Sequence, residues 1–153
     1  RELTPRKQSV LFDIGLTHLM QKEYEAAKAA MKEAFDLAPE YESARAYYIA
    51  AAIYAKDDVL ARELSAPPHD VLSEDNDLIL QAYYETRQYK NVLAILDARI
   101  QKNPADLQAR VSKAAVHHES GDTPAAIAVL EEAARDFPEF KAQAEQFIAE
   151  IRR

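Results

Sequence analysis

The chain contains 153 residues, carries a formal net charge of −7 and has no cysteine. Because phosphate-binding surfaces need clustered lysine and arginine, this acidic balance argues against nucleic acid as a partner. Without cysteine the chain forms no disulfide, thiol nucleophile or cysteine-based zinc site. A chain of this length buries roughly 70% of its extendable surface, which is enough for a hydrophobic core.

Prolines recur along the chain at a regular interval. The four that set the interval are Pro5, Pro39, Pro104 and Pro138. Their sequence numbers differ successively by 34, 65 and 34, and 65 is 34 plus 31. Proline lacks an amide donor and disfavours helix at the preceding residue, so this spacing indicates an array of helical hairpins. The predicted units span residues 8–41, 42–72, 73–106 and 107–140, of which the second is degenerate.

Within these units the apolar pattern predicts eight helices. They cover residues 6–21, 24–37, 41–56, 58–64, 75–87, 89–102, 105–120 and 124–137. Thr123 directly precedes Pro124, so Thr123 is predicted as the N-cap of the last of these helices. The acidic pair Asp57 and Asp58 and the acidic segment 75–77 also precede helices, where carboxylates cap free amides.

A ninth helix is predicted at residues 139–152. The apolar side chains on one of its faces are Phe140, Ala144, Phe147, Ile148 and Ile151. Because an open helical array leaves an apolar end, we expect this helix to be a cap. At the other end, residues 1–5 match the tail of a preceding unit, and the chain has neither an initiator methionine nor a signal segment. We therefore expect the N-terminus to be truncated from a longer chain.

Small residues stand where paired helices would touch. Gly15 and Ala27 occupy the eighth and twentieth positions of the first unit, and Ala114 and Ala126 occupy the same positions of the last unit. This pattern resembles the tetratricopeptide repeat (TPR), a hairpin of two helices that recurs with the same period. The resemblance implies an all-α fold: a right-handed superhelix (α-α solenoid) of four hairpins with a C-terminal capping helix, forming one domain over residues 1–153. It also implies a non-catalytic scaffold that binds a partner protein.

In TPR proteins the first helix of each unit lines a concave groove, and the resemblance implies the same here. The candidate partner-binding residues are Phe12, Leu16, Tyr47, Tyr54, Gln81, Tyr84, Glu85 and His118. One end of this set is apolar and aromatic and the other is polar and acidic, so we expect a protein or peptide segment that is apolar or aromatic and carries basic residues. For Phe12, Tyr47, Tyr54 and Tyr84 a packing role in the core is an equally open alternative.

Motifs of catalysis are absent from the sequence. It has no glycine-rich phosphate loop, nucleophile elbow or nucleophile–base pair, so we expect neither enzymatic activity, catalytic residues nor a cofactor. His117 and His118 are adjacent and therefore face different sides of a helix, whereas a metal pair needs a spacing of three or four residues. We expect His117 to pack, His118 to be solvated and no metal to bind.

A second, narrower resemblance supplies an alternative function. Residues 3–8, the Pro67-Pro68 pair and residues 141–152 are similar to soluble TPR tails of bacterial O-antigen ligase-type membrane proteins. In that case the chain would be an accessory or regulatory tail of a membrane glycan ligase or transferase. It would be tethered to a bacterial inner membrane through a missing N-terminal part; otherwise it would be cytoplasmic. The longest apolar run, residues 46–55, is too short to span a bilayer, so we expect no membrane insertion by this chain itself.

Overall fold

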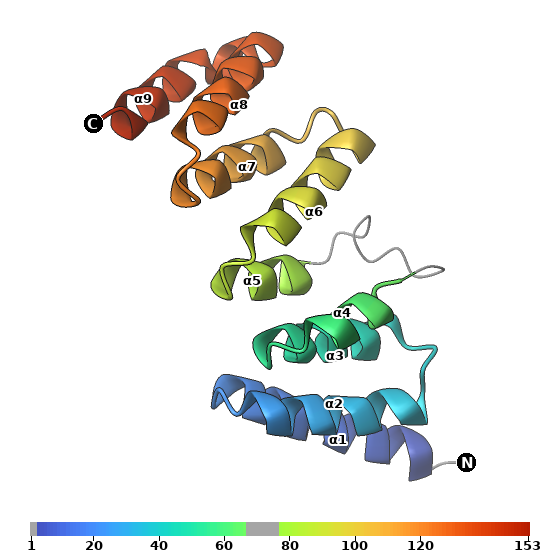
Figure 1. The fold of residues 1–153 in the computed structure, drawn as a ribbon. Coiled ribbons are helices and arrows are strands. Elements are labelled where there is room, and N and C mark those ends of the chain that lie inside the picture. Colours follow the sequence, from blue (N-terminus) through green and yellow to red (C-terminus); the bar gives the residue numbers. More distant parts are fainter. Residues whose placement is uncertain (1–2, 67–76) are drawn as a thin grey trace. The chain divides into compact units, whose positions relative to one another are not determined.

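The computed structural model describes residues 3–66 and 77–153, and their regular structure is entirely helical (Figure 1). No strand occurs in these two ranges, so the predicted all-α class is confirmed for them. The helices are α1 (Leu3–Met20), α2 (Tyr24–Leu37), α3 (Glu42–Tyr54), α4 (Asp58–Leu64), α5 (Asp77–Glu85), α6 (Tyr89–Lys102), α7 (Leu107–Glu119), α8 (Thr123–Asp136), the 3-10 turn η1 (Pro138–Phe140) and α9 (Lys141–Ile151).

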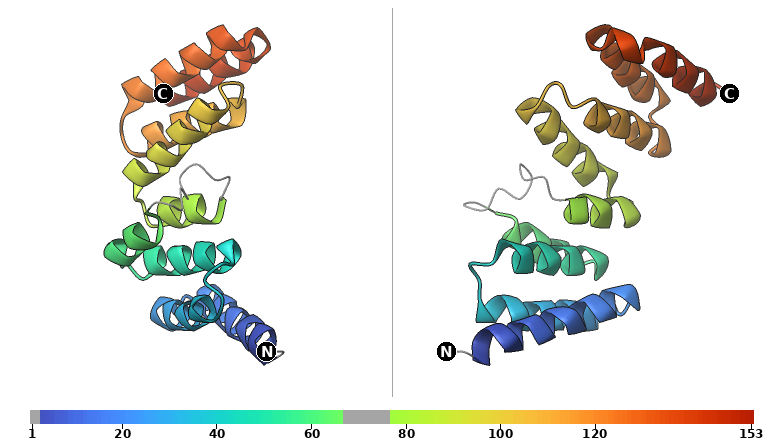
Figure 2. Two further views of the ribbon diagram at one scale, coloured as in Figure 1. Left: turned by 90° about the vertical axis from the view of Figure 1, so that its right-hand side faces the viewer. Right: turned by 180° about the vertical axis from the view of Figure 1, so that it is seen from behind.

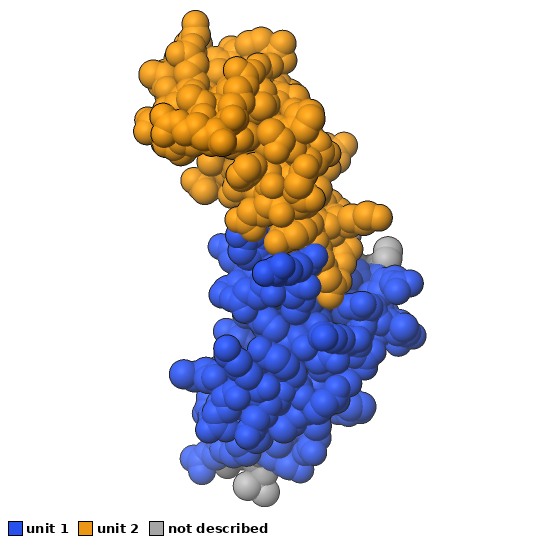
Figure 3. Space-filling view, turned by 60° about the vertical axis from the view of Figure 1, so that its left-hand side comes forward, with its two compact units in different colours: residues 1–87 blue, residues 88–153 orange. Residues whose placement is uncertain are grey.

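The chain divides into two compact units, Arg1–Arg87 and Gln88–Arg153 (Figure 3). In the first unit α2 packs against α1 and α3, and α3 also contacts α4 and α5. In the second unit α7 lies between α6 and α8, and α9 packs on α8. Helices α1 and α2, which are joined by a short turn, lie side by side in every view (Figure 1, Figure 2). The boundary falls between α5 and α6, inside the predicted unit 73–106.

Helix bounds agree closely with the prediction, with differences at the ends. Helix α1 begins at Leu3, three residues before its predicted start, and includes Pro5 in its first turn. A proline is tolerated there because a first-turn amide has no partner within the helix. Similarly, Pro138 opens η1, which precedes α9, whereas the predicted helix runs continuously from residue 139. The predicted start of the fifth helix, residues 75–76, lies outside the described residues, as does the Pro67-Pro68 pair.

Four turns share one backbone conformation. In each predicted hairpin, one residue after the first helix has a positive φ. These residues are Lys22 (60°), Lys56 (60°), Arg87 (58°) and Gly121 (89°). Their sequence numbers differ successively by 34, 31 and 34, and each is the fifteenth residue of its predicted unit. This left-handed conformation ends a helix because it turns the next amides back toward the last carbonyls.

The hydrogen bonds of these turns recur as well. Gly121 N–H donates to the carbonyl of His118 at 3.0 Å, and Asp122 N–H donates to that of His117 at 2.8 Å. Lys22 N–H and Lys56 N–H donate in the same way to the carbonyls of Leu19 and Ile53, both at 3.0 Å. Both bonds of the Gly121 turn belong to the Schellman motif.

Aspartates cap the helices that follow these turns and loops. The carboxylate of Asp57 accepts from Leu60 N–H at 3.2 Å, which confirms its predicted capping role. The predicted N-cap Thr123 is wrong: Thr123 is the first residue of α8, and Asp122 accepts from Ala125 N–H at 3.1 Å. The backbone conformation of Gly121 directs Asp122 toward the free amides of α8. The negative charge of the Asp122 carboxylate is also stabilised by the positive end of the helix dipole.

The twentieth residue of each predicted unit is buried and at most 2% exposed. Three of these residues are alanines, Ala27, Ala61 and Ala126, and the fourth is the larger Val92. Gly15 faces Met31 so closely that a Cβ atom at Gly15 would lie 2.7 Å from Met31 Cε. Real Cβ atoms do not approach other atoms this closely, so the α1–α2 contact requires glycine at this position or a displaced Met31.

The recurring turn conformation yields a test by substitution. Gly121→Ala should lower the free energy of unfolding by about 1 kcal/mol, because alanine resists a positive φ. No heavy atom lies within 4 Å of the added Cβ, so the loss reports backbone strain alone. Lys56→Gly should raise stability by about 0.5 kcal/mol, since glycine relieves strain but gains freedom in the unfolded chain. Urea unfolding measures both; changes of the same sign would contradict the assigned conformations.

Candidate partner-binding surfaces

The predicted groove residues fall into two exposure classes. Gln81, Tyr84, Glu85 and His118 are exposed, and Tyr84 keeps 39% of its surface accessible. The four half-buried residues are Phe12, Leu16, Tyr47 and Tyr54. All but His118 belong to the first compact unit, so the two units each present their own candidate surface.

Phe12 and Tyr47 pair across α1 and α3 beside the core. Their ring centroids lie 4.7 Å apart at an interplanar angle of 81°, an edge-to-face contact that aromatic quadrupoles favour. Together with Leu16 they pack against a buried cluster that contains Met31 and Tyr48. For Phe12, Leu16 and Tyr47, therefore, the packing role is real, and only the outer part of each side chain is available to a partner.

Tyr54, Gln81 and Glu85 form a hydrogen-bonded group on α3 and α5. The hydroxyl of Tyr54 donates to Glu85 Oε2 at 2.8 Å, and Gln81 Nε2 donates to Glu85 Oε1 at 2.7 Å. The structure thus brings together three of the predicted residues. Both donors are neutral, so the carboxylate of Glu85 is held in place while keeping its negative charge.

Burial raises the pKa of the Tyr54 hydroxyl well above its ordinary value, and the hydrogen bond to Glu85 raises the pKa further. The tyrosinate would lose hydration and stand against a carboxylate, which is why the protonated form is favoured. Tyr54 is accordingly a fixed hydrogen-bond donor over the physiological pH range.

Tyr24 was not among the predicted site residues, yet it stacks on Tyr54. The two rings lie 5.2 Å apart and 12° from parallel. They line a hollow of about 480 Å³ together with Glu23, Glu25 and Lys56. A signal existed in the sequence, because Tyr24 and Tyr89 both occupy the seventeenth position of their predicted units. The charges around this hollow are mixed: Lys28 pairs with Glu25 at 3.0 Å.

In the second unit a hollow of about 300 Å³ lies between α7, α8 and α9. It is lined by Val111, Ala114, Ala115, His118, Leu130, Phe147, Glu150 and Ile151. His118 is a predicted groove residue, and it lies at this hollow as an exposed side chain. Sequence reasoning missed the contribution of α9, whose predicted role was only that of a cap.

Apolar side chains of η1 and α9 pack against α8. Phe140 of η1 and Ala144 and Ile148 of α9 are at most 9% exposed and form one cluster with Leu130 and Ala133 of α8. The placement of α7 beside α8 is fixed by Arg110, whose Nη1 donates to Asp136 Oδ2 at 2.7 Å. The hollow therefore has packed walls on all three helices.

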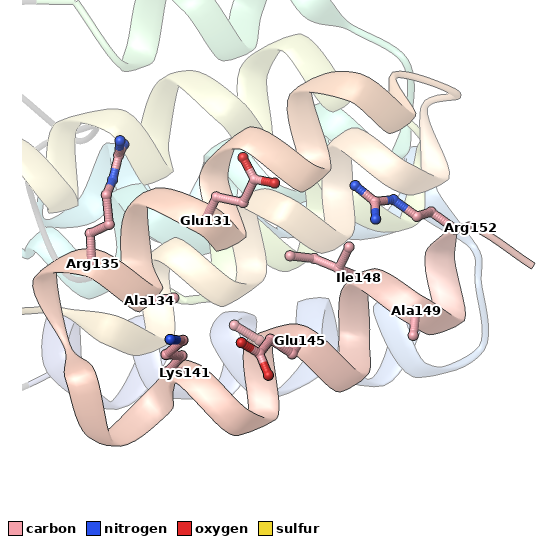
Figure 4. Close-up of a pocket in the computed structure, with 9 residues that line it drawn as sticks. Glu131, Ala134, Arg135, Lys141, Glu145, Ile148, Ala149 and Arg152 are labelled. Atoms are coloured by element: carbon pink, nitrogen blue, oxygen red, sulfur yellow. The ribbon is translucent and has the colours of Figure 1, made fainter.

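A larger and more polar hollow of about 700 Å³ follows the other side of α8 and α9 (Figure 4). Its floor is formed by Ala134, Ala144, Ile148 and Ala149, and its charged side chains are Glu131, Arg135, Lys141, Glu145 and Arg152. In Figure 4, Arg135 and Lys141 lie toward one end and Arg152 toward the other, with Glu131 and Glu145 between them. Because both signs of charge alternate, this surface favours no one class of ligand.

The described helices carry neither a metal cluster nor a membrane span. In residues 3–66 and 77–153, no three histidine, aspartate or glutamate side chains converge in a way that could hold a metal ion. His117 is half-buried and His118 is exposed, as expected from their adjacent positions. No helix in the described part of the chain has the length and apolarity needed to cross a bilayer.

Neither a protein-family model nor a curated protein matches the chain. The resemblance to TPR proteins therefore remains a prediction from sequence.

The Tyr54–Glu85 bond predicts a specific dependence of stability on pH. A tyrosine whose pKa rises on folding contributes fully below its unfolded pKa of about 10 and loses that contribution as the pH rises further. The difference in melting temperature between the wild type and Tyr54→Phe should therefore be largest below pH 10 and narrow above it. Glu85→Gln should bring the pKa of Tyr54 closer to its ordinary value, measured by tyrosinate absorbance. A pH-independent difference would show that burial and the Glu85 contact do not raise the pKa of Tyr54 on folding.

Proposed function

We propose that the chain is a TPR-type helical repeat protein: a right-handed superhelix of four hairpins closed by α9, acting as a non-catalytic protein-interaction module. Three independent features support this. The left-handed turn residues recur along the sequence in steps of 34, 31 and 34, the same steps into which the proline intervals divide. The twentieth position of each unit is buried. Within each compact unit most packed helix pairs are neighbours in sequence, as in repeat proteins; an exception is α3 with α5.

The partner is a peptide or protein segment that is apolar or aromatic and carries basic residues. Helix α5 carries the exposed ring of Tyr84 and the exposed carboxylate of Glu85, which the hydroxyl of Tyr54 on α3 holds in place. An exposed aromatic ring and an oriented carboxylate on one helix are the observation that carries the proposal. Aromatic side chains supply most of the contact energy in such interfaces, and the carboxylate selects a cation. The net charge of −7 would also speed encounter with a basic partner.

The alternative, an accessory tail of a membrane glycan ligase, rests on the sequence resemblance of residues 3–8, 67–68 and 141–152 alone. The interaction surface proposed here would serve either setting.

Selection from a displayed random-peptide library tests the proposal. Enriched peptides should combine an aromatic or large apolar residue with lysine or arginine. Tyr84→Ala should weaken binding of such a peptide by on the order of 1–3 kcal/mol, with little change in melting temperature, because the ring is substantially exposed. Glu85→Gln should reduce the preference for basic peptides.

The matched control is Tyr47→Ala, which removes a ring that packs against the core. It should lower the melting temperature by several degrees, whatever its effect on binding. Enrichment of acidic peptides, or unaltered binding by Tyr84→Ala and Glu85→Gln together, would refute the proposed surface.

A further inference from the structure

Helix α9 carries more apolar side chains than are needed to cover α8. A cap has to cover the end of α8, and Ala144 and Ile148 do so from buried positions. Phe147 and Ile151 follow at a spacing of four residues on the same helix, and both remain half-buried. Side chains four residues apart share one helix face, so these two form a second apolar strip beside the buried one.

This second strip faces the first helix of the last predicted hairpin. Phe147 and Ile151 line the hollow of about 300 Å³ opposite Val111 and Ala115 of α7. Ala115 is exposed, and its methyl group leaves space that a larger side chain would fill. The volume lies at the lower end of the range for ligand pockets, which suits one large apolar side chain better than a whole cofactor.

The rim of the hollow carries an acidic group. Glu150 of α9 lies beside Ile151 and lines the hollow with the imidazole of His118. The carboxylate of Glu150 accepts a long hydrogen bond from Gln146 Nε2, at 3.5 Å. Its near neighbour in sequence, Arg152, lines the other hollow, on the far side of α9 (Figure 4). Glu150 is exposed, so its carboxylate can be reached by a cation that approaches the rim of the hollow.

The geometry points to an anchor pocket between α7, α8 and α9 that takes one leucine- or phenylalanine-sized side chain of a peptide whose following residue is lysine or arginine. The apolar side chain enters between Phe147, Ile151 and Val111, and the basic residue reaches Glu150. This inference rests on the proposed interaction function and assigns it a site in the second unit. Helix α9 is then a wall of the binding site as well as a cap.

Nuclear magnetic resonance of the full chain tests the pocket directly. The probe is a twelve-residue acetylated, amidated serine–glycine peptide carrying a central Phe-Arg pair. It should shift the backbone signals of Ala115, His118 and Ile151. Peptides with Phe-Glu or Ala-Arg at the same place should bind at least tenfold more weakly. Equal shifts with all three peptides, or no shifts at these positions, would overturn the pocket.

Substitutions separate the pocket from the rest of the molecule. Ala115→Leu should fill the hollow and abolish the shifts that the Phe-Arg peptide causes at His118 and Ile151, whereas Ala128→Leu, the same change at an exposed position of α8, should leave these shifts intact. Glu150→Gln should remove the preference for Phe-Arg over Phe-Glu. If Ala115→Leu binds like the wild type, the pocket is not the site.

Two further outcomes identify other occupants and would also reject the inference. Shifts at Ala115 and Ile151 that grow with protein concentration, without peptide, would mean that a second copy fills the hollow. Shifts at Gln81 and Glu85 without any at Ala115 would place peptide binding in the first unit alone. In that case the proposed function would survive while the anchor pocket would not.

Discussion

The close approach of paired helices is the constraint on which the structure depends. At Gly15 a Cβ atom would lie 2.7 Å from Met31 Cε, so a larger residue there would displace the Met31 side chain. In the last hairpin Ala114, Ala126 and Ala133 are at most 2% exposed. Larger side chains in the same clusters, such as Met31 and Leu130, are also at most 2% exposed. Phe12 and Tyr47 pack at the edge of the cluster that contains Met31, where part of each ring remains exposed.

Much of this fold could be predicted from the sequence because its signals are local. Proline spacing and alanine positions report helix ends and helix contacts without knowledge of distant residues. Glycine indicates a positive φ in a sequence, and among these four turns only the last has one, Gly121. The other turns place Lys22, Lys56 and Arg87 at a positive φ, which the sequence alone does not indicate. Thr123 was mistaken for a cap because the choice between it and Asp122 depends on that same backbone conformation.

The candidate surfaces were less predictable, because they depend on contacts between side chains of different helices. The pattern identified Tyr54, Gln81 and Glu85, but not the hydrogen bonds that join them. The pattern could not decide whether Phe12 and Tyr47 pack in the core or face solvent, because both side chains are half-buried and do each in part. The α9 wall was missed for a similar reason: Phe147 and Ile148 look alike in a helical pattern, yet only Ile148 is buried.

The distribution of internal ion pairs supports the proposed preference for basic partners. Several cations at helix contacts are already paired: Lys28 with Asp57, Arg110 with Asp136 and Lys113 with Asp97. By contrast, Glu85 and Glu150 accept hydrogen bonds from neutral groups, which orient these carboxylates without cancelling their charge. A basic residue that approaches either of them replaces water and leaves these neutral hydrogen bonds in place. An aspartate of an internal pair would first have to release its cation, which would leave that cation without its partner. For this reason we propose Glu85 and Glu150, and not the paired aspartates, as the contacts of a basic ligand.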